Sequence, residues 1–109
     1  MRQIEQQMNF ALTHKGNFSK SNTRVEYNEN SNCSTVVLHR TAIATYDHNT
    51  QALKLNTGGW HSVTTKSRLN AILQELIGCA SVYQKNWNWF VNLQNGGTIP
   101  FYSGIELNH

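Results

Sequence analysis

A run of glycines, hydroxyl side chains and basic residues between positions 58 and 68 has the composition of a phosphate-binding site. Gly58 and Gly59 come first, and the run continues into a segment with helical periodicity. Free backbone N–H groups and the helix dipole favour an anion at a helix N-terminus. The spacing differs from that of a P-loop, and an ordinary helix N-cap with one tryptophan in the core would look similar. The residues expected to contact nucleic acid or another anion are Trp60, His61, Thr64, Thr65, Lys66 and Arg68.

Aromatic residues flank a lysine further along the chain. Tyr83, Trp87 and Trp89 surround Lys85 in a segment that predicts a β-hairpin, with Asn86–Trp87 as its turn. Aromatic and basic side chains on a sheet suit single-stranded nucleic acid, for which Lys85 would supply a phosphate contact. They equally suit a protein interface or the core beneath a helix. We expect one tryptophan to be buried and the other exposed.

The sequence offers little for catalysis or for metal binding. Its five histidines and six carboxylates are dispersed, so that no pair stands out for acid–base chemistry. The nucleophile elbow and the His-Glu-x-x-His motif are both absent. Cys33 and His39 share a strand face but lie on the order of 20 Å apart, too far to hold one ion. We therefore expect no enzyme activity, no cofactor and no metal.

Strand and helix patterns must position these residues. An apolar stripe predicts one amphipathic helix, for which Thr64 or Thr65 can supply the N-cap oxygen; Asn70 and Ala71 are expected on its outer face. The order β-β-β(-β)-α-β-β predicts an α+β fold, an antiparallel β-meander with one amphipathic helix packed on the sheet. The stripe consists of Leu69, Ile72, Leu73, Leu76 and Ile77. The strands are expected at 23–27, 34–39, 41–46, 52–56, 81–85, 88–92 and 98–102.

Residues 1–22 differ from the single α+β domain expected at 23–109. Ile4, Met8 and Leu12 form a weak helical stripe that Gly16 would end, and a polar linker follows it. Two alternatives stay open for this N-terminal leader, a docked helix or a disordered segment.

Composition narrows the class of protein. The chain has 109 residues, enough for one domain, and its net charge of +3 comes without any run of Lys or Arg. This charge disfavours an acidic DNA mimic and permits nucleic-acid binding without requiring it. The sequence shows neither a secretion signal nor a membrane-spanning run, so we expect an intracellular protein with free thiols at Cys33 and Cys79.

The Gly-Trp-x-x-x-Thr-Thr-Lys-x-Arg-Leu-Asn stretch at 59–70 is the most specific pattern in the chain. Together with segments 22–25, 37–39 and 83–85, it resembles a family of small tailed-phage proteins that includes proteins of cyanobacterial phages. The resemblance covers about residues 22–92. It implies a phage origin and action in the cytoplasm of the bacterial host, and it supplies no catalytic residues.

Two functions from different classes remain open. In the first, a phage accessory protein binds and modulates or inhibits a host protein or defence complex, as an anti-CRISPR does, through Tyr83, Trp87 and Trp89. In the second, the chain binds DNA or RNA through the helix start and Lys85, with an affinity that falls steeply with salt. Homodimerisation through a strand edge is compatible with both functions. No membrane partner is expected.

Overall fold

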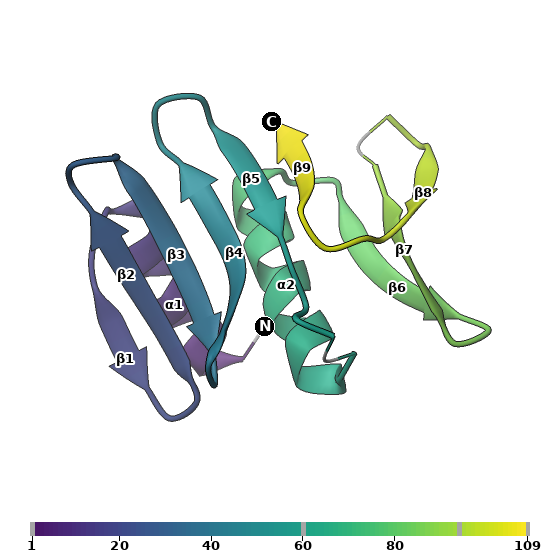
Figure 1. Ribbon diagram of the computed structural model, residues 1–109, viewed down its shortest axis with the longest axis horizontal. Helices are drawn as coiled ribbons and strands as arrows, with labels where there is room; N and C mark the ends of the chain where they lie inside the picture. The colour runs from purple at the N-terminus through teal and green to yellow at the C-terminus, as the bar shows by residue number, and fades with distance from the viewer. Residues whose placement is uncertain (1, 60, 94, 109) are drawn as a thin grey trace.

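The computed structural model describes residues 2–59, 61–93 and 95–108. The α+β class is confirmed, with a β-meander and a helix packed on it (Figure 1). The detail is richer than expected, because the described residues form two helices and two antiparallel sheets. The helices are α1 (Gln3–Thr13) and α2 (Val63–Leu76). No helix among the described residues is long and apolar enough to cross a membrane.

A six-stranded antiparallel sheet forms one layer of the molecule. Five consecutive strands build it as a meander, and the C-terminal strand then pairs with the fifth. In order across the sheet they are β1 (Phe18–Lys20), β2 (Thr23–Asn28), β3 (Cys33–Leu38), β4 (Thr41–Asp47), β5 (Ala52–Leu55) and β9 (Ile105–Asn108). One row of paired apolar residues crosses all six strands: Phe18, Val25, Val36, Ala44, Leu55 and Ile105. Because strand side chains alternate between faces, this row gives the sheet one apolar face.

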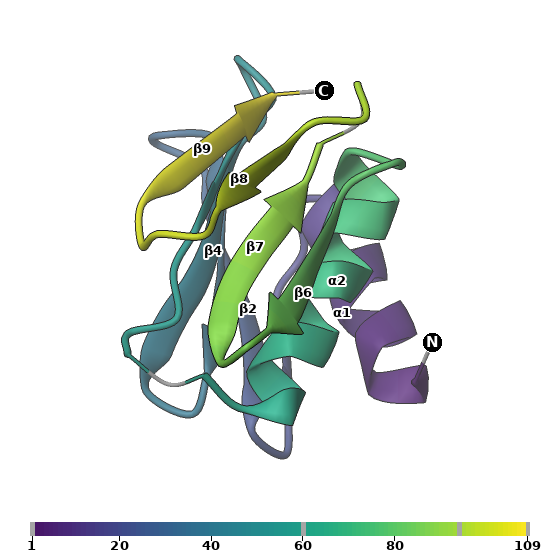
Figure 2. The ribbon, with the colours of Figure 1, turned by 90° about the vertical axis from the view of Figure 1, so that its right-hand side faces the viewer.

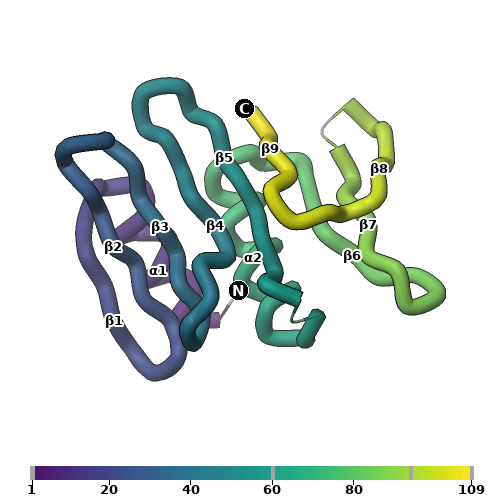
Figure 3. The backbone as a smooth tube through the Cα atoms, in the orientation of Figure 1, coloured from purple at the N-terminus to yellow at the C-terminus, as the bar shows by residue number. Residues whose placement is uncertain are grey.

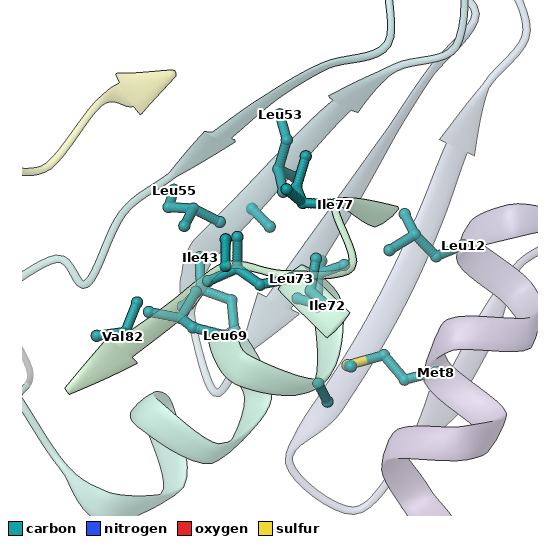
Figure 4. Packing of buried hydrophobic residues seen from close by; sticks show 14 of the residues in the cluster. Met8, Leu12, Ile43, Leu53, Leu55, Leu69, Ile72, Leu73, Ile77 and Val82 are labelled. Carbon is teal, nitrogen blue, oxygen red and sulfur yellow. The ribbon is translucent and has the colours of Figure 1, made fainter. Parts of the chain in front are cut away.

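Both helices cover that apolar face (Figure 2). Met8 and Leu12 of α1 and Leu69 and Ile72 of α2 are fully buried in the same core (Figure 4). Ala71 was expected on the outer face of its helix, but it is buried because α1 packs against α2 on that side. One amphipathic stripe therefore understates how much of α2 is covered.

The N-terminal segment is part of the core. Of the two alternatives for residues 1–22, the structure has the docked helix, since α1 contacts α2 and the sheet. Asn9 ties the two helices together, its Nδ2 donating a hydrogen bond to the carbonyl of Ala71 at 3.0 Å. The expected linker contains β1, whose Phe18 pairs with Val25. α1 and β1 thus pack in the same core and sheet as the residues that follow them.

A second, three-stranded sheet lies beside α2, next to β9 (Figures 1 and 2). It consists of β6 (Ser81–Lys85), β7 (Asn88–Asn92) and β8 (Thr98–Pro100). The expected hairpin is present, and Asn86 and Trp87 both have positive φ, 51° and 68°, as a type I′ turn requires. Val82 and Val91 pair on the face that turns inward, and both are buried.

Candidate functional site

The first turn of α2 is capped by Ser62, so the prediction of Thr64 or Thr65 as the N-cap is wrong. The N–H of Thr65 donates to Ser62 Oγ at 3.1 Å, and the two hydroxyl oxygens lie 2.9 Å apart. Thr65 is buried and Thr64 is half-buried. The hydroxyl of Thr65, which was expected to bind an anion, thus contacts the N-cap residue of its own helix.

Arg68 lies in a buried ion pair and is not available to a phosphate. Its Nη1 donates to Glu5 Oε2 at 2.8 Å, and its Nε donates to Thr23 Oγ1 at 3.0 Å. Ser67 donates a further hydrogen bond to the same carboxylate oxygen at 2.6 Å. Only 3% of Arg68 is exposed. A residue expected to contact phosphate instead joins α2 to α1 and β2.

The contacts of this cluster change the pKa of the Glu5 carboxylate. Burial raises the pKa of Glu5, but the hydrogen bonds from Ser67, Arg68 and the Arg2 N–H, together with the positive charge of Arg68, outweigh burial and hold the pKa below its usual value. Glu5 therefore stays ionised and neutralises Arg68 at neutral pH. A charge compensated in this way contributes little to long-range attraction of nucleic acid.

The remaining residues of the expected nucleic-acid site are spread over two elements. His61 is exposed before α2, Lys66 is half-buried in the first turn of α2, and Lys85 is exposed at the end of β6. Trp60 lies outside the described residues. The structure therefore leaves two basic side chains of that set, Lys66 and Lys85, free of the ion pairs found in the described chain.

The outward face of the three-stranded sheet carries an aromatic row that sequence reasoning identified only in part. Tyr83 and Phe90 are paired across β6 and β7, and their rings stack with centroids 5.6 Å apart and an interplanar angle of 26°. Pro100 of β8 pairs with Phe90 on its other side. Counting outward from the Asn86–Trp87 turn would have placed Phe90 opposite Tyr83. We call Tyr83, Lys85, Trp87, Phe90 and Pro100 the hairpin surface.

The two tryptophans of the hairpin point in different directions, as expected. Trp87, at the tip, is 91% exposed, whereas Trp89 is 6% exposed. The ring of Trp89 makes edge contacts with His61 and Phe101, at centroid distances of 4.8 and 6.0 Å. Trp89 is thus a core residue between the small sheet and the α2 loop. Of the aromatic residues expected at an interface, Trp87 and Tyr83 are on the surface.

Charge is nearly absent from the segment of the sequence that carries the hairpin surface. Between residues 76 and 105 the sequence has one charged side chain, Lys85, but it has six of the eleven aromatic residues in the chain. Depletion of charge together with enrichment of aromatic residues is typical of the centre of a protein–protein interface. A nucleic-acid surface would need several cations along the phosphate backbone.

One serine–histidine pair resembles a nucleophile and its base. Ser34 Oγ lies 2.8 Å from His48 Nε2, at the end of the six-stranded sheet. Ser34 is fully buried, so a substrate cannot reach its hydroxyl. Burial lowers the pKa of His48, and the positive charge of Lys15 lowers it further, whereas Asp47 opposes both.

The described residues contain no group of three or more His, Cys, Asp or Glu side chains that could hold a metal ion. Cys33 and Cys79 are free thiols.

Comparison with known protein families gives a match over almost the whole chain. The model of the family described as Kyanoviridae Gp96 protein matches residues 1–108. This range includes α1 and β9, which lie outside the part covered by the resemblance noted above. No curated protein and no solved structure matches the chain. The chain therefore belongs to the Kyanoviridae Gp96 protein family, a family of cyanophage-like phage proteins.

Proposed function

We propose that this phage protein binds a host protein through the hairpin surface and thereby inhibits or redirects it, a defence complex being one such target. The observation that carries the proposal is Trp87, which is 91% exposed at φ 68°. A bulky residue in the left-handed region costs about 1–2 kcal/mol. An exposed tryptophan there contributes no compensating contact within the fold, so its value lies in a contact outside it.

Burial of Trp87 against a partner would supply substantial binding energy. An aromatic side chain buries about 150–250 Å², which corresponds to about 4–6 kcal/mol of hydrophobic free energy. The stacked pair of Tyr83 and Phe90 and the ring of Pro100 extend the apolar area across three strands. Rings held in a sheet lose little conformational entropy on binding, which favours affinity. The hairpin surface therefore has the composition of an anchor set in a rigid frame.

The charge pattern favours a protein over a nucleic acid as the partner. Lys85 could contact one phosphate, whereas strong binding of nucleic acid needs several such contacts. Arg68, the one arginine expected to help, is neutralised by Glu5. Stacking of bases on Tyr83 and Phe90 is the remaining route for single-stranded nucleic acid, and it is an outcome that the test below distinguishes.

The test compares capture by the wild-type protein and by Trp87→Gly from the lysate of a cyanobacterial host, with and without nuclease. Glycine suits the positive φ, so this variant removes the anchor and relieves the backbone. We expect a specific host protein to be retained after nuclease treatment and its affinity to fall about 30-fold to 1,000-fold in Trp87→Gly. Phe10→Ala is the matched control, since Phe10 is 65% exposed on α1.

Two results would contradict this proposal. Equal capture by the wild-type protein and Trp87→Gly would show that Trp87 is not the anchor. Loss of all captured material on nuclease treatment, with binding that weakens steeply as salt rises, would identify nucleic acid as the partner.

A further inference from the structure

A pocket of about 430 Å³ opens at the end of the molecule where α2 begins. Leu38 and Ile43 supply buried apolar walls from β3 and β4, and the hydroxyl-bearing residues Thr41, Thr57, Ser62 and Thr65 also line the pocket. None of the described residues that line the pocket belongs to the hairpin surface that we propose as the protein interface. Its volume lies within the usual range for small-molecule sites, about 300–1,000 Å³.

One side of this pocket forms where the loop after β5 passes close to the start of β4. Gly58 has φ +62°, and a Cβ at this position would lie 2.6 Å from Cγ2 of Thr41. The loop after β5 can therefore pass close to the start of β4 only because residue 58 has no side chain. Thr57 is buried beneath it, with its Oγ1 accepting a hydrogen bond from the N–H of Gly59 at 3.2 Å. The wall is thus a defined part of the fold.

One arginine lies at the edge of the pocket. His39 and Arg40 form the turn between β3 and β4 and line it with exposed side chains. None of the described residues that line the pocket carries a carboxylate. Arg40 takes part in neither of the two ion pairs found in the described chain, which join Arg24 to Glu26 and Arg68 to Glu5.

The same end of the molecule holds further cations. The β1–β2 turn, the β3–β4 turn and the loop into α2 all lie at one end of the layers (Figure 3). Lys20 precedes the first of these turns, and Lys66 is in the first turn of α2. The arrangement matches a ligand whose apolar part enters the pocket while its negative charge remains near Arg40.

We propose that this pocket binds a small molecule with an apolar, ring-sized body and one anionic group. A carboxylate and a phosphate both fit this description, because an arginine can pair with either in a bidentate geometry. The proposal rests on the cavity, its apolar walls and the unpaired arginine at its edge. It is independent of the function proposed for the hairpin surface.

The test uses three probes that share one ring system: 1-naphthoate, 1-naphthyl phosphate and neutral 1-naphthamide. Each is titrated into the ¹⁵N-labelled full chain, and amide shifts report both affinity and position. We expect saturable shifts at Thr41, Thr57 and Ser62, with at least one anionic probe binding about tenfold or more tightly than the amide. The stronger anionic probe identifies whether a carboxylate or a phosphate is preferred.

Two variants assign the effect to the pocket. Arg40→Gln should remove the preference for the anionic probes, whereas Lys54→Gln, which changes an exposed lysine of β5, should leave it intact. Thr41→Phe should fill the pocket and weaken binding of all three probes. Circular dichroism establishes that each variant is folded, and if Thr41→Phe is not, Arg40→Gln decides the question.

Three outcomes would overturn the proposal. One is the absence of saturable shifts at the pocket residues with either anionic probe. Another is equal affinity for the anionic and neutral probes. The third is an anion preference that persists in folded Arg40→Gln.

Discussion

Asn70 of α2 binds the backbone of Val82 in β6 with both ends of its side-chain amide. Its Nδ2 donates to the carbonyl of Val82 at 3.0 Å, and the N–H of Val82 donates to its Oδ1 at 2.6 Å. An amide side chain thus takes the place of a neighbouring strand along the edge of the three-stranded sheet. An edge satisfied in this way is less available for pairing with another chain.

Replacing Asn70 by alanine should therefore destabilise the fold. The change leaves the N–H and carbonyl of Val82, a buried residue, without their partners. An unsatisfied buried polar group costs about 1–3 kcal/mol. Because the hydrogen bonds between Asn70 and Val82 are partly exposed, we expect the unfolding free energy to fall by about 2 kcal/mol. Urea denaturation followed by circular dichroism measures it. Gln74→Ala, an exposed change on the same helix, is the control, and equal stability of the two variants would contradict the assigned role.

A second stability prediction concerns Arg68. Arg68→Ala leaves the carboxylate of Glu5 buried without its cation, which should cost about 3–5 kcal/mol of unfolding free energy. The double variant Glu5→Gln with Arg68→Ala removes both charges and should lose clearly less unfolding free energy than the sum of the losses in Glu5→Gln and in Arg68→Ala. Lys66→Ala, two positions away, should have a small effect. Additive losses in the double-mutant cycle would show that the two side chains are not coupled.

These contacts show which features of α2 follow from the local sequence pattern and which depend on distant residues. The apolar stripe of the helix follows from residues three and four apart, and the structure confirms it. Asn70 was expected on the outer face of the helix and Arg68 in an anion site, because a helix on one sheet has one buried face. Their partners, Glu5 and Val82, are 63 and 12 positions away, on elements that cover two further sides of the helix. No local period encodes those contacts.

The strands show the same division between local and distant information. The hairpin was predictable because its turn and its alternation lie within about a dozen residues. β9 was missed, since four residues after a glycine give little pattern, and its pairing with β5 joins Ile105 to Leu55 across half the chain. At the candidate site, the identity of the exposed tryptophan follows from register, whereas burial of Arg68 depends on the docking of α1 and β2, which supply Glu5 and Thr23.

Stability should depend on pH through His48. Burial and Lys15 lower the pKa of this imidazole below its ordinary value of 6.5. As the pH falls below 6.5, the unfolded chain takes up a proton that the folded chain does not, so the unfolding free energy decreases until the folded-state pKa is passed. Urea denaturation over this range should show the decrease, and His48→Gln should reduce it.

The titration of His48 can be followed directly by the NMR shifts of its ring protons. Lys15→Gln removes a nearby positive charge, so it should raise the pKa of His48 and narrow the pH range of the loss. A pKa of His48 that is unchanged in Lys15→Gln would contradict the proposed influence of that charge.

Substitution of Trp87 separates the effect on the stability of the fold from the effect on partner binding. Trp87→Gly should raise the unfolding free energy by about 1 kcal/mol, because glycine adopts φ 68° without the steric cost paid by tryptophan. The lost side chain is 91% exposed, so its removal takes almost no buried area from the fold. Urea denaturation of Trp87→Gly and of Trp87→Ala, which keeps a Cβ, isolates the backbone effect. If Trp87→Gly is more stable than the wild-type protein and binds the partner less tightly, then Trp87 destabilises the fold and contributes to the interface. A loss of stability would instead show that Trp87 is a structural residue.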